Sequence, residues 1–360
     1  MFKYILLNII IFIMNDSSKY ANKGLTGLKN IGNTCYLNSC MQILSHCYIF
    51  NDVLADKEFK NRLNNCIDSV LLIEWDDLHD LMWSKNCIIS PNRYVNAVQK
   101  IATVKNRELF TGFIQNDFPE FLIFILECFH NALKHEVEMQ IDGTAVTVTD
   151  TLAKKCYEAM KTMFSKEYSD IINIFYAIQV TTISSINDNR VLSIVPEPYC
   201  LLSLPINNNC NTLYDCLNLY CNNEILENDN AWYNDKTCKY ETASKEIKFW
   251  SLPNVLIIDL KRFTNNSTKI NKLIHVPLEN LDLQTYINGY NKDTYIYNLF
   301  GICNHHGGCF GGHYTAYVKN ANNNWYASTV RAEPATPESV DFSRSSLQFL
   351  ITLYLEFQDE

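Results

Sequence analysis

The chain has 360 residues, of which 47% are hydrophobic and 19% are charged, and its formal net charge is -9. This is the composition of a globular protein with an ample core, which excludes a disordered or low-complexity chain. The negative charge argues against nucleic acid as a partner and favours a partner that is basic where it docks. The 14 cysteines lack the paired spacing of secreted proteins, which predicts a reducing compartment, the cytoplasm or the nucleus.

Residues 1–20 form an apolar N-terminal tail, in which the run from Ile5 to Met14 is interrupted only by Asn8. The run is short for a membrane span, and no small-residue cleavage site follows it. Three interpretations stay open, in order of preference: a start placed too far upstream or a disordered tail, a membrane anchor, and a secretion signal. We place the boundary of the folded domain after residue 20.

The stretch from Gly27 to Leu44 changes character at Cys35. Its first half is rich in Gly and Asn, whereas apolar residues recur at i, i+4 and i+7 in its second half, which predicts a helix with Thr34 as N-cap. A thiol in the first turn of a helix ionises more readily, and the thiolate is the reactive form. Asn30, on the approach to this helix, offers an amide that can donate to a developing oxyanion. Most of the other cysteines fit a simpler role as small buried hydrophobes.

The segment from Phe110 to His130 predicts a second informative helix. Asp117 precedes Phe118 and a proline, and Glu120 takes the third helical position, as in a capping box. These two acidic residues therefore have a structural interpretation as helix caps, independent of any contact with a ligand.

The remaining periodicities predict a framework of core helices followed by strands. Helices are expected at 71–83, from Ser90-Pro91 onward, and at 212–219. Strands are expected at 173–184, 199–206, within 249–263, and at 347–357. We assign no chemistry to any of these elements.

The segment from Tyr295 to Val318 predicts a strand, a flexible glycine-rich loop over Gly307 to Gly311, and a second strand that begins at His313. Such a hairpin places His313 at the mouth of the loop, where its imidazole can reach another element. A loop of this kind can also gate a cleft.

Three motifs in order, Gly-Asn-Thr-Cys-Tyr-Leu-Asn-Ser, Phe-x-Gly-x-x-Gln-x-Asp-x-x-Glu-Phe-Leu and Gly-Gly-His-Tyr-Thr-Ala-Tyr, resemble those of the ubiquitin-specific proteases. These are papain-like, deubiquitinating cysteine proteases. The resemblance covers residues 25 to 357 and implies an α+β fold with a helical thumb, a β palm and β fingers. It implies that Cys35 is the nucleophile, His313 the general base and Asn30 part of the oxyanion hole. A catalytic domain over residues 21–357 would then act on the C-terminal glycine of ubiquitin.

The same resemblance implies that Gln115, Asp117 and Glu120 lie where the arginine-containing tail of ubiquitin is received. The third catalytic residue departs from the pattern, because no Asp or Asn stands just after Trp325. Ser328 is the preferred replacement and Thr329 the alternative; a hydroxyl orients a histidine but adds no negative charge. The chain is therefore expected to be a weak enzyme, or an inactive one that still binds ubiquitin. A protease for another ubiquitin-like modifier is a further alternative.

Many members of this family hold a zinc ion in the fingers with two Cys-x-x-Cys pairs, and a structural zinc needs four close ligands. The sequence lacks these pairs: the first is missing altogether, and only Cys238 stands near the second. We therefore expect neither metal nor cofactor. The expected partners are ubiquitin or ubiquitinated proteins, with a membrane involved only if the N-terminal run is an anchor.

Overall fold

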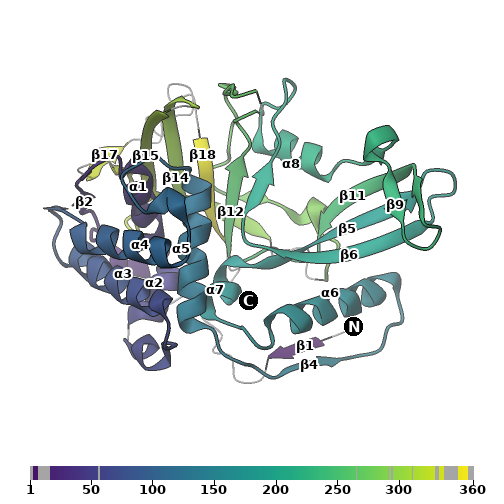
Figure 1. Cartoon of the computed structure of the whole chain (residues 1–360), viewed down its shortest axis with the longest axis horizontal. Coiled ribbons are helices and arrows are strands. Elements are labelled where there is room, and N and C mark those ends of the chain that lie inside the picture. The colour runs from purple at the N-terminus through teal and green to yellow at the C-terminus, as the bar shows by residue number, and fades with distance from the viewer. Residues whose placement is uncertain are drawn as a thin grey trace.

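The described part of the protein contains a group of helices with a large β-sheet beside it, and a smaller β-sheet that extends to the other side of Figure 1. The computed structural model describes residues 3–6, 17–55, 57–264, 266–290, 292, 295–309, 311–328, 332–335 and 348–355. Within these ranges the arrangement is the α+β thumb, palm and fingers that the sequence predicts.

The thumb is a group of helices packed around one continuous apolar core. Its helices are α1 (Cys35–Ser45), α2 (Tyr48–Ala55), α3 (Ile67–Ser84), α4 (Asn92–Val104), α5 (Phe118–Leu133) and α7 (Asp170–Phe175). The short strands β2 (Gly27–Leu28) and β3 (Ile88–Ile89) pair in parallel beside them. Every residue of α1 is buried, so this helix lies in the core with the others around it.

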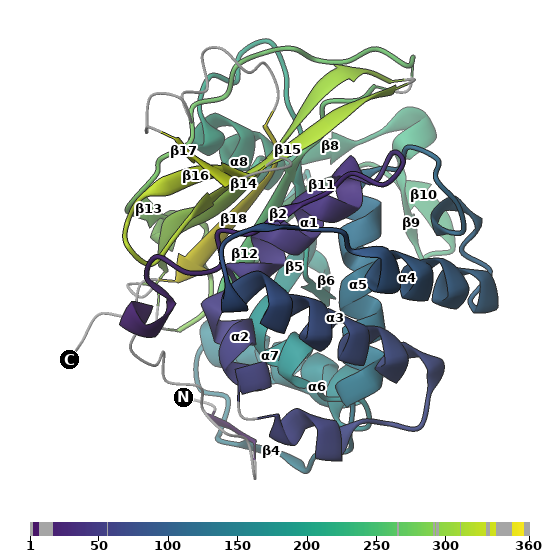
Figure 2. The same cartoon turned by 90° about the vertical axis from the view of Figure 1, so that its left-hand side faces the viewer.

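The palm is the larger sheet, and it lies against α1. In spatial order its strands are β17 (Ala332–Ala335), β16 (Trp325–Ser328), β15 (Gly311–Lys319), β14 (Ile296–Gly308), β18 (Gln348–Leu355), β12 (Val255–Leu260) and β7 (Leu202–Leu204), with β13 (Leu281–Asp282) paired to β14. The helix α1 contacts both β15 and β14, and Figure 2 shows it in front of this sheet. The start of α1 and the hairpin of β14 and β15 are thereby brought together.

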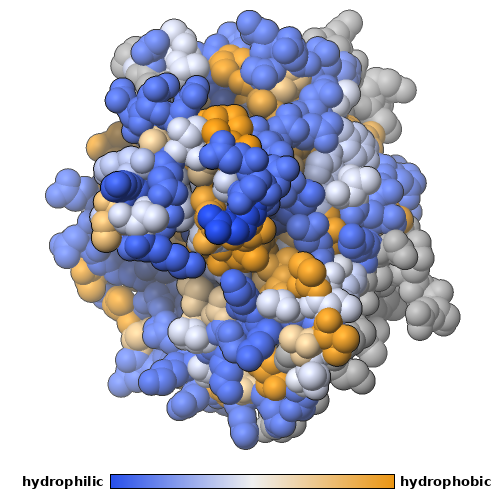
Figure 3. All heavy atoms as spheres, turned by 90° about the vertical axis from the view of Figure 1, so that its right-hand side faces the viewer, coloured by the Kyte–Doolittle hydropathy of each residue, from blue (hydrophilic) through white to orange (hydrophobic). Residues whose placement is uncertain are grey.

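The fingers are a second sheet that extends away from the thumb (Figure 1). It consists of β6 (Val191–Tyr199), β5 (Ala177–Ser185), β11 (Ala243–Phe249) and β8 (Glu224–Leu226), and the hairpin of β9 (Trp232–Asn234) and β10 (Lys239–Glu241) lies near its end. The helix α6 (Val148–Phe164) packs an apolar face on β5, and α8 (Leu213–Cys221) contacts β11. Figure 3 shows hydrophilic side chains over most of this end of the molecule, with separate apolar patches.

The N-terminal segment is partly described. Residues Lys3–Leu6 form β1, which pairs antiparallel with β4 (Met139–Asp142). The rest of the apolar run, residues 7–14, lies outside the described residues, and the domain boundary after residue 20 stays a prediction. Among the helices that the structure describes, none combines the length and the apolarity that a membrane crossing needs.

Most of the predicted elements are confirmed, with two corrections. The segment 173–176 was expected to be a strand, but residues 170–175 form α7, because the Ser169 hydroxyl caps the helix by accepting from the Ile172 N–H at 3.3 Å. The predicted loop over Gly307 to Gly311 is also wrong: the pairing of β14 with β15 continues to Gly308 opposite Gly311. The hairpin is therefore paired almost to its tip.

Candidate active site

The candidate nucleophile Cys35 is the first residue of α1, as predicted. The helix is fixed to the preceding segment by two buried amide side chains. Asn38 donates to the Leu28 carbonyl at 3.1 Å, and Gln42 donates to the Thr26 carbonyl at 2.7 Å. Cys35 therefore lies at the positive end of a helix that has little freedom to move.

Asn30 organises the turn that leads to Cys35. Its side-chain oxygen accepts from the Gly32 N–H at 3.1 Å, the Thr34 N–H at 3.1 Å and the Thr34 hydroxyl at 3.2 Å. Thr34 occupies the N-cap position as predicted, but its side chain makes no capping bond to α1, since its hydroxyl is engaged with Asn30. Because the oxygen of Asn30 is held by the turn, its amide N–H groups are directed away from the turn and remain available as donors.

The same turn is joined to the loop that precedes α5. The Asn33 amide donates to the Phe113 carbonyl at 3.0 Å, and the Phe113 ring lies against Gly32. A Cβ added to Gly32 would lie 3.2 Å from that ring, and the φ of +129° at this residue also disfavours a side chain. The cysteine loop and the approach to α5 therefore form one connected wall.

Asp117 caps α5 as predicted, accepting from the Glu120 N–H at 3.1 Å. Burial raises the pKa of Asp117, and the hydrogen bond from Glu120 opposes that rise. Asp117 is half-buried, whereas the Glu120 side chain is exposed. The structural role of Asp117 is confirmed, and contact of either residue with a substrate stays a prediction.

The hairpin of β14 and β15 carries His313 close to its tip. In the strand register His313 lies opposite His306, and Tyr314 lies opposite His305. Because successive strand residues point to opposite faces, Tyr314 is buried in the thumb-facing core while His313 is exposed. His305 and His306 both belong to β14.

Tyr314 lies close to the start of α5 and is also near Cys35 at the start of α1. Its ring centroid lies 6.0 Å from that of Phe118, the first residue of α5. Burial raises the pKa of Tyr314, and nearby Asp117, Cys303 and Cys35 raise it further. The residue adjacent to His313 is thus within electrostatic range of the candidate nucleophile.

The side chains of Cys35 and His313 are placed on contacting elements but are not joined. The helix α1 packs on β15, yet within the described residues neither the sulfur nor the imidazole makes a hydrogen bond. Their pairing in catalysis stays a prediction.

Gln115 provides a direct link between the thumb and the hairpin. Its side-chain oxygen accepts from the Gly312 N–H at 2.9 Å, next to His313. In this structure the Gln115 oxygen holds the hairpin, and the expected contact of Gln115 with the substrate stays a prediction.

A further link at the hairpin was not foreseen from the sequence. Lys269 donates to the Nδ1 of His305 at 2.9 Å and to the carbonyls of His305 and Gly307 at 2.9 and 3.1 Å. Burial and the nearby Arg262 lower the pKa of Lys269 to about 8. Lys269 is 36 residues from His305 in sequence, and no local pattern connects the two.

Ser328, the preferred third catalytic residue, is 3% exposed, and its hydroxyl has no partner among the described residues. In the register of β15 and β16 it lies opposite Ala316, so its side chain shares the face of Ala316 and Tyr314. His313 alternates to the other face. The role of Ser328 stays a prediction that this register does not favour, and the alternative, Thr329, lies outside the described residues.

Comparisons with known proteins agree on one family. The family model described as ubiquitin carboxyl-terminal hydrolase matches residues 26–336. Ubiquitin carboxyl-terminal hydrolase 2 of Gallus gallus is 30% identical over 343 residues, covering 91% of this chain and 93% of that protein. Its counterpart from Bos taurus is 29% identical over 352 residues, covering 94% of this chain but 56% of that protein. The chain thus spans little more than half the length of the mammalian relatives that it matches.

The fold is also similar to solved structures. A chain of the SAGA DUB module that contains Ubp8, Sgf11, Sus1 and Sgf73, bound to monoubiquitin, aligns with a TM-score of 0.72. The sequence identity is 21%, and the alignment covers 97% of this chain and 72% of that one. At this identity the similarity establishes the fold.

Proposed function

Because the chain belongs to the ubiquitin carboxyl-terminal hydrolase family, we propose that it hydrolyses the peptide or isopeptide bond at the C-terminal glycine of ubiquitin, with a cysteine as nucleophile. The observation that carries this proposal is the placement of Cys35 at the start of a buried helix that packs on the strand of His313.

In the proposed reaction His313 takes the proton of Cys35, and the thiolate attacks the carbonyl carbon of the C-terminal glycine. The outward amide of Asn30 and backbone N–H groups at the start of α1 stabilise the oxyanion. The tetrahedral intermediate collapses as His313 protonates the leaving lysine amine. Water, deprotonated by His313, then hydrolyses the thioester, releases ubiquitin with a free carboxylate and restores the thiol.

The acidic residues at the start of α5 support the proposed substrate. Asp117 lies near Tyr314 of the hairpin, Glu120 is in the first turn of the same helix, and carboxylates attract a basic tail. Gln115 holds Gly312 in the same place. We propose that a basic peptide tail passes along these three residues to reach Cys35.

We further propose that residues 21–357 are the catalytic domain and that it works in a reducing compartment, the cytoplasm or the nucleus. All fourteen cysteines are free, and the proposed nucleophile needs a reduced thiol. Among the described residues no three His, Cys, Asp or Glu side chains come together as a metal site would require, and the mechanism uses none.

The decisive experiment is turnover of ubiquitin that carries a fluorogenic amide at its C-terminus. The wild-type chain is expected to release the fluorophore, and Cys35→Ala is expected to abolish release, because no other group in the proposed site can form the thioester. Cys40→Ala, a change at a buried cysteine of the same helix, serves as control and should retain activity. Equal rates for wild type and Cys35→Ala would refute the proposal.

A second candidate function is binding of ubiquitin without cleavage. The placement of Ser328 on the face opposite His313 favours it, since an unoriented imidazole is a poor base. Covalent labelling with C-terminal electrophile probes of ubiquitin and of other modifiers separates the alternatives. Labelling of Cys35 by the ubiquitin probe supports hydrolysis, and binding without labelling supports the second function. Labelling only by the probe of another modifier would indicate that this modifier, rather than ubiquitin, is the substrate.

A further inference from the structure

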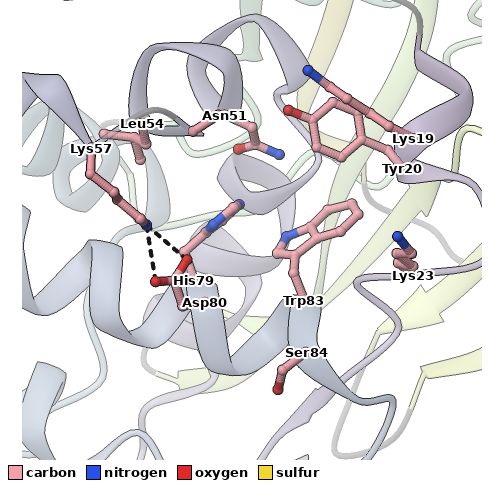
Figure 4. Close-up of a pocket in the computed structure, with 11 residues that line it drawn as sticks. Lys19, Tyr20, Lys23, Asn51, Leu54, Lys57, His79, Asp80, Trp83 and Ser84 are labelled. Atoms are coloured by element: carbon pink, nitrogen blue, oxygen red, sulfur yellow. Dashed lines mark hydrogen bonds and ion pairs between the residues drawn. The ribbon is translucent and has the colours of Figure 1, made fainter.

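The thumb contains a cavity that the proposed reaction does not use. Its volume is about 410 Å³, and it lies among α2, α3 and the segment that precedes β2 (Figure 4). His46, which directly follows the last residue of α1, has its ring centroid 5.6 Å from that of the lining residue Trp83. An eleven-residue helix is about 16 Å long, so the cavity is well separated from Cys35. The lining residues that carry the argument are Lys19, Tyr20, Lys23, Asn51, His79 and Trp83.

Three buried polar atoms in this lining have no partner among the described residues: Asn51 Oδ1, His79 Nε2 and Trp83 Nε1. Asn51 is 1% exposed, and its nitrogen donates to the Ser45 carbonyl at 2.7 Å, which leaves the oxygen as its unsatisfied end. His79 is 8% exposed. A buried polar atom without a hydrogen bond costs about 1–3 kcal/mol, so three around one cavity supply hydrogen-bonding groups that a ligand can satisfy.

These atoms specify both a donor and an acceptor on the ligand. The indole N–H of Trp83 needs an acceptor, and Asn51 Oδ1 needs a donor. Burial and the nearby Lys57 lower the pKa of His79 to about 3, so its ring is neutral at pH 7 and Nε2 can take either role.

The charge at the rim favours an anion. Lys19 pairs with Asp52 at 2.5 Å, and Lys57 pairs with Asp80 at 2.8 Å. Lys23, which Figure 4 labels in the lining, has no ion pair with any residue that the structure describes. A ligand with one negative charge would supply the missing ion-pair partner of Lys23 at this rim.

The walls favour a flat apolar body. The Tyr20 and Trp83 ring centroids are 5.2 Å apart at an interplanar angle of 72°, and Tyr20 is stacked on Tyr48 at 4.6 Å. Leu54 adds an aliphatic surface. Rings that are fixed in this way provide a preformed surface for an aromatic molecule.

From these features we infer that the cavity binds a small aromatic carboxylate that also carries a hydrogen-bond donor, such as a phenolic hydroxyl. The carboxylate accepts from Trp83 and lies near Lys23, the ring lies along Tyr20 and Trp83, and the donor reaches Asn51. A two-ring compound fits well within 410 Å³.

The test uses 6-hydroxy-2-naphthoate as probe, with its methyl ester and 2-naphthoate as partners that lack the charge or the hydroxyl. Binding is followed by the indole N–H resonance of Trp83 in the full chain, which Trp83→Phe identifies by its disappearance. The hydroxynaphthoate is expected to shift this resonance with saturation, and each partner compound to bind about threefold to tenfold more weakly, since each lacks one polar contact.

Two variants sharpen the result. Lys23→Gln is expected to raise the Kd of the hydroxynaphthoate about threefold, whereas Lys100→Gln removes an equally exposed charge on α4 and should leave it unchanged. No shift of the Trp83 resonance at millimolar probe would overturn the inference and indicate a cavity that holds water only. Equal binding of all three compounds, or equal effects of the two variants, would overturn it as well.

Discussion

The candidate site lies between α1 with the turn that precedes it, here called the α1 wall, and the hairpin of β14 and β15, here called the hairpin wall. These two walls are held in place by different means. The α1 wall is fixed by burial, since every residue of the helix is inside the core, and by the buried amides of Asn38 and Gln42. The hairpin wall is exposed near its tip, where side chains from other elements anchor it: Gln115 at Gly312, and Lys269 on β14.

This difference indicates that the nucleophile is preorganised while the base is adjustable. Packing holds Cys35 through many small contacts, so that no single polar contact decides its position. His313 lies next to one exposed hydrogen bond, and its imidazole makes none within the described residues. Binding of a tail beside Gln115 could therefore shift the hairpin without disturbing α1.

Among the tests of this contrast, the largest effect is expected from His313→Gln. Glutamine cannot take the thiol proton, so we expect the rate of ubiquitin amide hydrolysis to fall about 10²–10⁴-fold, with the thermal midpoint unchanged because His313 is exposed. His306→Gln alters the residue directly opposite in the register and should cost no more than a few-fold. Equal losses for both would show that the hairpin, rather than the imidazole, limits the reaction.

On the opposite wall, Asn30→Asp separates anchoring from catalysis. The carboxylate can still accept from the Gly32 and Thr34 N–H groups, but the outward donor is lost and a negative charge faces the oxyanion. We expect kcat to fall about 10²–10³-fold at unchanged stability. Asn189→Asp, at an exposed turn of the fingers, is the matched control. Activity within twofold of wild type would remove Asn30 from the oxyanion hole.

The sequence alone was sufficient to predict the structural features that depend on residues close together in the chain. The start of α1 at Cys35, the cap at Asp117 and the helix at 212–219 follow from residues within a few positions of each other. The strand predicted at 173–184 begins only at residue 177, because the segment before it follows a capping Ser169, and the cap prevailed over β-propensity.

Contacts between distant segments could not be predicted. Nothing near Lys269 or Gln115 indicates that these residues bond to β14 and β15, because such contacts depend on the packed arrangement of the sheet. The face of Ser328 likewise depends on strand register, and a shift of one residue reverses it. The sequence motifs therefore locate the candidate site, whereas the hydrogen bonds that position its residues can be seen only in the structure.

The buried α1 wall carries a pH dependence of its own. Burial lowers the pKa of His46 at the end of α1 to about 4, whereas in the unfolded chain it is near 6.5. The unfolded state therefore binds the proton first as the pH falls below 6.5, and stability is lost down to about pH 4. Between pH 7 and pH 5 we expect a loss of about 2 kcal/mol from this group in urea unfolding.

His46→Gln should make that decline shallower, even if it lowers stability at pH 7. His275→Gln, at an exposed histidine of the palm region, should leave the decline as in wild type. Identical pH profiles for wild type and His46→Gln would mean that the end of α1 does not resist protonation, which would weaken the contrast between the walls.

The smallest expected effect, and the one that tests the hairpin wall directly, comes from Gln115. If its oxygen positions the hairpin by accepting from the Gly312 N–H, Gln115→Ala should lower kcat about threefold to tenfold, the cost of one exposed hydrogen bond. Gln115→Glu retains an acceptor oxygen and should restore most of the rate. If the amide N–H instead contacts ubiquitin, both variants should raise KM alike while kcat holds. The split between kcat and KM thus decides whether Gln115 acts on the hairpin or on the substrate, and a lack of effect in both would leave Lys269 as the principal anchor of the tip.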